Sequence, residues 1–228
     1  DFITKTVDFM ATKRTKSEAE TLELYRISLE NVGKQPTIAA SMAGIGYDAA
    51  TISEGKALLK KTRQTFDINR FEARKTAAAY ADFFAAKATL GKTYGYHRKI
   101  SKIIFKKDTL TLNRLAVSGS MPKAYIAWLE TVKTFYRVST TDPSIQDKLA
   151  RLKITADALH SAQTLINRLE TTRTFYLRKK GESQNATKTK NKTFEKLDKW
   201  MAEFYAVAKI SLEDKPQLME SLGKLVKG

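Results

Sequence analysis

The chain has 228 residues, of which 42% are hydrophobic and 29% charged, so it can bury a sizeable core and does not have a disordered composition. It has no cysteine, which excludes disulfides, thiolate metal sites and a cysteine nucleophile. The formal net charge is +17, from 41 Lys and Arg against 24 Asp and Glu, and a surface of this sign attracts anions. Only 4 Pro and 10 Gly interrupt the chain, which favours long helices.

The sequence also bears on location. No run of residues approaches the roughly 18 apolar residues of a membrane span, so we expect no transmembrane segment. The chain begins at Asp1 rather than at Met, and any leader peptide would already be missing. We therefore favour the cytoplasm, keep export open, and leave the oligomeric state open as well.

The first residues, 1–15, are expected to form a loose basic arm, and helices follow it. Ser17 and Glu20 have the spacing of a capping box, in which each side chain bonds the backbone amide of the other residue. That box predicts a helix that runs to Gly33. Pro36 suits the first turn of a short second helix.

A long helical stretch comes next. Asp48 is its predicted N-cap, and residues 49–90 contain no Pro and a single Gly. We expect a turn near residues 67–70 to fold this stretch into an antiparallel hairpin. Residues 109–117 alternate like a strand, but the corresponding place in the second half reads as a helix, so we expect a short helix capped by Asp108.

The second half of the sequence follows the same plan. Pro122 opens a predicted helix, and Asp142 followed by Pro143 is an N-cap with a first-turn proline. Thr155 begins the next predicted helix. Residues 178–191 are polar and contain a glycine, so we expect a second hairpin turn there.

The two halves correspond at an offset of about 107 positions, which is the pattern of an internal repeat. Pro36 falls on Pro143, and apolar positions coincide along the same offset. The sequence thus predicts an all-α fold, an internally duplicated helical bundle with long helical hairpins. The expected parts are the basic arm at 1–15 and two repeat units at 16–117 and 123–228, packed as one body rather than joined by a flexible tether.

Residues 181–222 combine a GE-x-Q-x-AT run, an aromatic-rich helix and an ending in which acidic residues precede Pro-Gln-Leu. In these features they resemble the C-terminal part of a family of uncharacterised bacterial helical proteins. The first half is similar to that family at 46–48 and Gly55, but it has Arg-Lys-Thr-Ala at 74–77 in place of the Gly-Glu-Ser-Gln that begins the run. The family has no assigned activity, so the resemblance implies a helical fold and gives no residue a role.

The sequence contains no recognisable catalytic constellation. His97 and His160 are far apart, and Asp157 with His160 makes one Asp-x-x-His pair where a di-iron bundle needs two Glu-x-x-His pairs and further carboxylates. The run at 91–95 contains Gly-Lys-Thr but lacks the first glycine and the upstream strand of a phosphate loop. We therefore expect no catalytic residue, no metal, no cofactor and no enzyme activity.

The basic clusters are the remaining functional signal. Lys99, Lys102 and Lys106 share one face of a predicted helix and could pair with successive phosphates. The full set of candidate anion-binding residues is Arg98, Lys99, Lys102, Lys106, Lys107, Arg178, Lys179, Lys180, Lys188, Lys190 and Lys192.

These clusters predict a non-catalytic helical binding or scaffold protein with an anionic partner. Nucleic acid, held by phosphate contacts that do not depend on base sequence, is favoured over an acidic lipid surface, because the apolar stripes are needed for the core. Two alternatives stay open. In one, the charge serves only solubility in a structural or interaction protein. In the other, which is remote, an enzyme would use a carboxylate–lysine site built from Glu72, Glu195 or Asp198.

Overall fold

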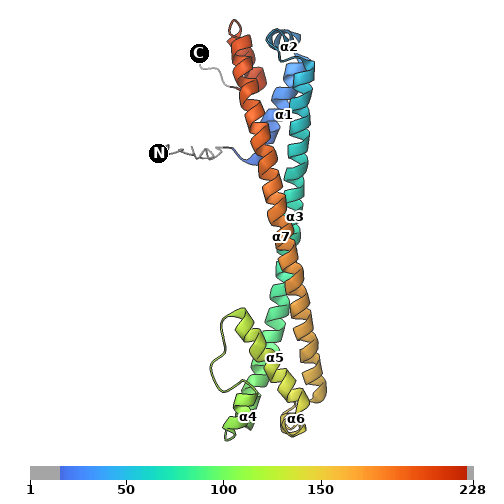
Figure 1. Ribbon diagram of the computed structural model, residues 1–228, viewed down its shortest axis with the longest axis vertical. Coiled ribbons are helices and arrows are strands. Elements are labelled where there is room, and N and C mark those ends of the chain that lie inside the picture. The colour runs from blue at the N-terminus through green and yellow to red at the C-terminus, as the bar shows by residue number, and fades with distance from the viewer. Residues whose placement is uncertain (1–15, 225–228) are drawn as a thin grey trace, which may run out of the picture. The chain divides into compact units, whose positions relative to one another are not determined.

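The computed structural model describes residues 16–224, so the predicted arm at 1–15 lies outside the described residues. The described residues form helices and no strand, and the predicted all-α class is confirmed (Figure 1). In chain order the elements are α1 (Glu18–Lys34), α2 (Pro36–Ala43), α3 (Ala49–Ile104), α4 (Thr109–Arg114), α5 (Tyr125–Thr141), α6 (Pro143–Ala150), α7 (Ala156–Ser211) and the 3-10 helix η1 (Pro216–Leu222).

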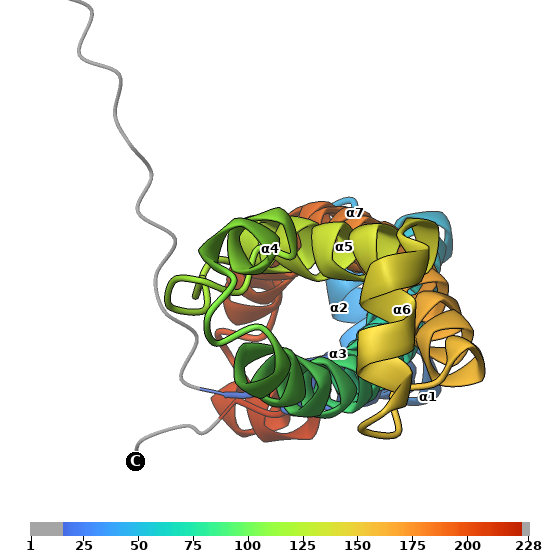
Figure 2. The ribbon, with the colours of Figure 1, turned by 90° about the horizontal axis from the view of Figure 1, so that it is seen from below.

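The chain forms two compact units, and each takes part of both long helices. Unit 1 runs up to Arg70 and resumes at Asn185, so it holds α1, α2, the first part of α3, the last part of α7 and η1. Unit 2 is Phe71–Gln184, with the rest of α3 and α7 and with α4, α5 and α6. Figure 2 views unit 2 from the end where α4 and α6 lie. Each compact unit thus draws on both predicted repeat units.

The two predicted hairpin turns are wrong, because the chain stays helical through both places. α3 is one helix of 56 residues that passes through 67–70, and α7 is one helix of 56 residues that passes through 178–191. No proline lies inside either helix. Residues 67–70 contain no glycine and 178–191 contain only Gly181, and each glycine costs a helix only about 1 kcal/mol. The polar composition of 178–191 is that of a solvated helix face rather than of a turn.

In unit 1 the two long helices bond each other where the first turn was expected. The Asn69 amide nitrogen donates to the Thr187 hydroxyl at 2.8 Å, and the hydroxyls of Thr65 and Thr193 are 2.7 Å apart. Residue numbers rise along α3 as they fall along α7, so the helices run antiparallel in this unit. Pairing of two long helices therefore replaces the predicted turn within one helix.

The predicted helix caps are confirmed. The Ser17 hydroxyl accepts from the Glu20 amide at 3.2 Å, and the Glu20 carboxylate accepts from the Ser17 amide at 2.7 Å, which completes the capping box. Asp108 accepts from the amide of Thr111 at 2.9 Å and caps α4, so residues 109–114 form a helix rather than a strand. Asp142 caps α6 in the same way.

The elements of the second half have the lengths of those in the first. α1 and α5 each have 17 residues, α2 and α6 each have 8, and α3 and α7 each have 56. Each begins about 107 positions after its counterpart, with α5 starting at Tyr125 rather than at Pro122. A duplication predicts equal order and length, and duplication as the origin of the two halves stays a prediction.

Each unit has its own apolar core. Four of the most deeply buried side chains in unit 1 are Leu29, Ile38, Met42 and Phe204, each at most 1% exposed. The most deeply buried side chains of unit 2 include Tyr94, Phe135, Tyr136 and Leu149, all 0% exposed. Burial of a side chain of this size stabilises a fold by about 1.5–3 kcal/mol, so each core can hold its short helices against the long ones.

Candidate anion-binding site

Two of the predicted anion-binding residues hold the segment between α4 and α5. The Arg98 guanidinium donates to the Val117 carbonyl at 3.3 Å and also bonds the carbonyl of Gly119. The ammonium of Lys102 lies 3.5 Å from the same Gly119 carbonyl. Both cations are therefore partnered within unit 2.

Two further predicted residues form internal ion pairs. Lys179 lies 2.5 Å from Glu182, and its side chain is 15% exposed. Lys190 lies 2.5 Å from Glu18, and its side chain is 11% exposed. An incoming anion would have to compete with these carboxylates, so we assign both lysines a structural role.

The other predicted residues are exposed but spread out. They are Lys99, Lys106, Lys107, Arg178 and Lys180 in unit 2, and Lys188 and Lys192 in unit 1. In unit 2 the Thr76 hydroxyl donates to the Lys179 carbonyl at 3.0 Å, so Thr76 marks the level of the α7 cluster on α3. Lys99 lies about 35 Å further along α3, at 1.5 Å per residue. The two predicted clusters of unit 2 are thus separate surfaces.

Basic side chains gather where α3 and α6 end and α4 and α7 begin. We call this surface the basic end of unit 2 and define it by Lys106, Lys107, Arg114, Lys148, Arg151 and Lys153. Its parts are in contact: the Lys148 ammonium, on α6, lies 5.6 Å from the ring centre of Phe105, which begins the turn after α3. α4 and α6 face the viewer in Figure 2. Sequence clustering found Lys106 and Lys107 and missed the cations that α6 and the next turn bring to them.

The cations on the two turns are free to bind. Lys106, Lys107, Arg151 and Lys153 are exposed and, within residues 16–224, have no ion pair and no side-chain hydrogen bond. Arg114 is different, since it lies 2.9 Å from Asp142. The turns 105–108 and 151–154 therefore supply the accessible charge of the basic end.

The acidic side chains at this end serve mainly as helix caps. Hydrogen bonds from the amide and hydroxyl of Thr111, followed by the charges of Lys148 and Arg114, lower the pKa of Asp108. The hydrogen bond from Arg114 and the one from the Ile145 amide lower the pKa of Asp142. Asp147 on α6 and Asp157 on α7 are exposed, and neither forms an ion pair with the cations defined above within the described residues.

The corresponding end of unit 1 is built from matching turns and carries different charge. The turn after α3 contains Lys106-Lys107, whereas the turn after α7 contains Glu213-Asp214. The turn before α7 contains Arg151 and Lys153, whereas the turn before α3 contains Gly44 and Gly46. The turn after α7 also holds Lys215, where the turn after α3 has Asp108. The turn 105–108 thus carries two cations and one acid, whereas the turn 212–215 carries two acids and one cation.

One of these cations occupies a backbone conformation that favours glycine. Lys153 has φ +68°, and Gly46 at the corresponding position has φ +92°. A left-handed conformation costs a residue with a side chain roughly 1–2 kcal/mol, which glycine avoids. Lys153 therefore occupies this turn although its backbone conformation is unfavourable in free energy.

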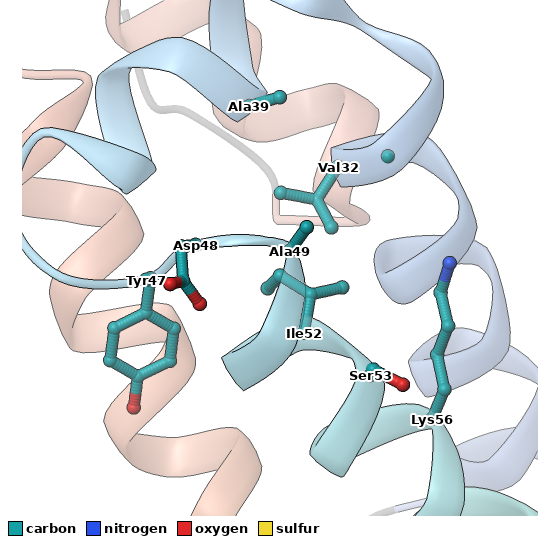
Figure 3. Close-up of a pocket in the computed structure, with 9 residues that line it drawn as sticks. Val32, Ala39, Tyr47, Asp48, Ala49, Ile52, Ser53 and Lys56 are labelled. Atoms are coloured by element: carbon teal, nitrogen blue, oxygen red, sulfur yellow. The ribbon is translucent and has the colours of Figure 1, made fainter.

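A small pocket opens in unit 1 between α1, α2 and the start of α3 (Figure 3). It has a volume of about 260 Å³, with Val32 and Ile52 among its apolar walls and Lys56 at its edge. The Asp48 carboxylate at the pocket already accepts from the Thr51 amide at 2.9 Å, as the N-cap of α3. Among the described residues that line it, the pocket therefore offers the cation Lys56 and no acid–base pair.

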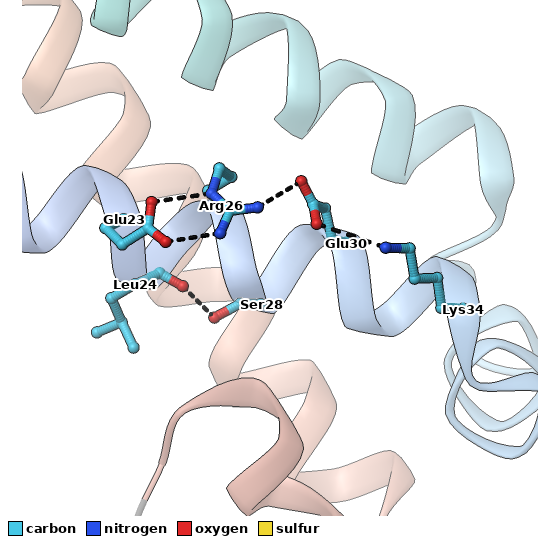
Figure 4. Close-up of polar contacts among 6 residues, drawn as sticks. All are labelled: Glu23, Leu24, Arg26, Ser28, Glu30 and Lys34. Carbon is cyan, nitrogen blue, oxygen red and sulfur yellow. Dashed lines mark hydrogen bonds and ion pairs between the residues drawn. The ribbon is translucent and has the colours of Figure 1, made fainter.

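The outer face of α1 is balanced by its own ion pairs (Figure 4). Arg26 lies 2.6 Å from Glu23 and 2.7 Å from Glu30, and Lys34 lies 3.6 Å from Glu30. Hydrogen bonds to Glu23 and then to Glu30 raise the pKa of Arg26. A balanced face does not attract an anion, so α1 contributes nothing to the candidate site.

The acids named for a carboxylate–lysine site do not line the pocket. Glu72 lies 3.3 Å from Lys75, and Glu195 lies 2.8 Å from the exposed Lys199. Asp198 accepts from the Tyr25 hydroxyl at 3.1 Å. Among residues 16–224 there is also no group of three side chains able to hold a metal ion.

His97 in unit 2 is buried, and its ring is hydrogen-bonded inside the core. It is 6% exposed, and its Nδ1 lies 3.0 Å from the Tyr136 hydroxyl. Burial lowers the pKa of His97 from its ordinary value of 6.5. The fold therefore favours the neutral imidazole.

Acidification is accordingly expected to destabilise unit 2 as the pH falls below about 6.5, because the unfolded chain then binds the proton more readily. Stability should be fully present above that pH, and the loss per pH unit should not exceed about 1.4 kcal/mol. Urea unfolding followed by circular dichroism between pH about 7 and about 5 measures this change. The carboxylates act at lower pH. His97→Gln should flatten the profile, and an equally steep profile in that variant would assign the effect to other groups.

Comparison of the chain with models of protein families, with curated proteins and with solved structures found no match. The resemblance to uncharacterised bacterial helical proteins stays a prediction. No helix in the described part of the chain is long and apolar enough to cross a membrane.

Proposed function

We propose that the protein is a non-catalytic helical binding or scaffold protein that holds an anionic partner at the basic end of unit 2. The observation that carries the proposal is the change of charge between corresponding turns, from Lys106-Lys107 to Glu213-Asp214. Solubility alone needs no such asymmetry, because any exposed position serves it equally well. The same asymmetry argues against charge as a solubility device only.

The groups at the basic end suit phosphate oxygens. The ammonium groups of Lys106, Lys107 and Lys153 act as point charges, and the Arg151 guanidinium can bond two oxygens at once. Binding breaks no ion pair of these four side chains within the described residues. Contacts of this type do not read a base sequence, and they weaken steeply with salt.

Lys106→Glu combined with Lys107→Asp is expected to weaken binding to anionic probes by at least about tenfold at low salt, since each surface cation contributes about 1 kcal/mol. The variant gives unit 2 the residues that unit 1 has at these positions. The probes are a short duplex DNA, followed by fluorescence anisotropy, and vesicles containing phosphatidylserine, followed by cosedimentation. With DNA, the slope of log affinity against log salt should fall by about 1 for each phosphate contact removed.

A matched control has the same change of net charge elsewhere. Lys188→Glu with Lys192→Asp alters two exposed lysines of unit 1 and should bind nearly as the unaltered protein does. Equal weakening by both double variants would mean that net charge, rather than the basic end, drives the binding. If the unaltered protein bound neither probe at low salt, the proposal would fall and the charge would serve solubility.

A further inference from the structure

Exposed aliphatic side chains lie among the cations of the basic end. Ile103 in the last turn of α3 is 66% exposed, and Leu110 in the first turn of α4 is 72% exposed. Leu152, between Arg151 and Lys153, is 41% exposed. Single exposed apolar residues are ordinary on protein surfaces. Here three of them share one end of one unit, and none belongs to the buried core of that unit.

This combination suits a lipid surface better than a nucleic acid. Cations attract anionic headgroups, and aliphatic side chains beside them gain free energy when they enter the boundary between headgroups and acyl chains. Non-specific contacts to nucleic acid use charged and polar groups on phosphates, or aromatic rings stacked on bases. The aromatic residue of this turn, Phe105, is 2% exposed and cannot stack on a base.

We propose that the basic end of unit 2 docks on an anionic membrane surface. Lys106, Lys107, Arg151 and Lys153 contact the headgroup phosphates, while Ile103, Leu110 and Leu152 enter the interface. This inference rests on the function proposed above and names its anionic partner. The left-handed backbone of Lys153 supports it, because strained residues persist where the surrounding structure and the function hold them.

Unit 1 provides the comparison within the same chain. Ile210 is 67% exposed and corresponds to Ile103, and Ile45 is 48% exposed and corresponds to Leu152. The turn after α7 is acidic at Glu213, and no cation flanks Ile45 in sequence. Lys209 precedes Ile210, and Lys215 follows the two acids of the turn, so the cations of unit 1 are offset by Glu213 and Asp214. Aliphatic exposure without an excess of cations should give little attraction to an anionic surface, so unit 1 is expected not to dock.

The test replaces the three aliphatic residues together, as Ile103→Ser, Leu110→Ser and Leu152→Ser. Affinity for mixed phosphatidylcholine and phosphatidylserine vesicles is expected to fall by at least about tenfold, the loss of one well-buried aliphatic side chain. Duplex DNA binding by the same variant should not change. The control Ile45→Ser with Ile210→Ser should leave vesicle binding unchanged. Circular dichroism should show that both variants are folded, as expected for exposed positions.

The outcomes separate this inference from the proposed function. Vesicle binding that survives the triple replacement but is lost with Lys106→Glu and Lys107→Asp overturns the insertion of the aliphatic residues and leaves the anionic site. Binding to duplex DNA with none to vesicles overturns the lipid assignment and favours nucleic acid. Binding to neither probe overturns both proposals.

The variant Lys153→Gly provides a second test, in which unfolding cannot account for a loss of vesicle binding. Glycine suits the φ of +68°, so the melting temperature should stay the same or rise. Vesicle affinity should fall by about fivefold, the contribution of one cation near an anionic leaflet. Unchanged vesicle affinity in this variant would remove Lys153 from the docking surface and contradict the argument drawn from its strain.

Discussion

Replacement of Phe204 by Ala is expected to destabilise unit 1 by about 3–5 kcal/mol, the cost of removing a fully buried aromatic side chain. Phe204 is 0% exposed. Its ring centre lies 5.6 Å from that of Trp200 and 6.4 Å from that of Tyr47, which precedes the N-cap of α3. The cavity would open in the core of this unit. The neighbouring rings of Trp200 and Tyr47 could fill it only by giving up their contact with each other. Urea unfolding monitored by circular dichroism measures the loss.

Phe84→Ala is the matched control, since the ring that it removes is 59% exposed. Its cost should stay below about 1 kcal/mol because little apolar area is lost from a packed environment. A loss in Phe84→Ala as large as that in Phe204→Ala would mean that a partner or another copy covers Phe84 under the conditions of measurement. A loss below about 1 kcal/mol in both variants would contradict the core of unit 1.

These two residues also show what a sequence can tell about burial. Phe83-Phe84 and Phe204-Tyr205 are both adjacent aromatic pairs on helices. The first residue of the second pair is fully buried, whereas the second residue of the first pair is mostly exposed. Which ring faces the core depends on where the partner helix lies, and local spacing does not contain that information.

Local signals, by contrast, predicted the helix ends well. Ser17, Asp108 and Asp142 all cap the helices expected of them, because a cap bonds amides only three residues away. The two hairpin turns were predicted wrongly for the opposite reason. A turn at 67–70 or 178–191 would have paired each helix with itself, and the fold pairs α3 with α7 instead, a choice made by residues far apart in the chain.

The same distinction between local and distant residues applies to the candidate site. The pair Lys106-Lys107 was predicted from the density of charge along the chain. Arg151 and Lys153 belong to the same surface only because α6 packs near the turn after α3. The contact between Lys148 and Phe105 shows this packing. The charge pattern also predicted Lys190 as a binding residue. No local pattern could have shown that the fold brings Glu18 to it.

Gly55→Ala is expected to destabilise unit 1 by about 1–3 kcal/mol, the cost of an added methyl group in a well-packed place. Alanine is the better helix former by about 1 kcal/mol, so the sign of the effect depends on packing. A Cβ at this position would lie 2.7 Å from Cζ2 of Trp200 and closer still to its neighbouring ring atoms. The ring cannot turn away easily, because it stacks on Phe204 and packs on Tyr47 at 5.9 Å.

Gly181→Ala is the counterpart on α7 and should act in the opposite direction. Nothing lies within 4 Å of a Cβ added at Gly181, so the replacement should stabilise the protein by about 0.5–1 kcal/mol through helix propensity alone. Urea unfolding of both variants in parallel measures the two signs. Because a glycine that ends a helix prefers a left-handed conformation, alanine would destabilise a turn at this place. Destabilisation by Gly181→Ala would therefore contradict the continuous α7, while stabilisation by both replacements would contradict the contact between Gly55 and Trp200.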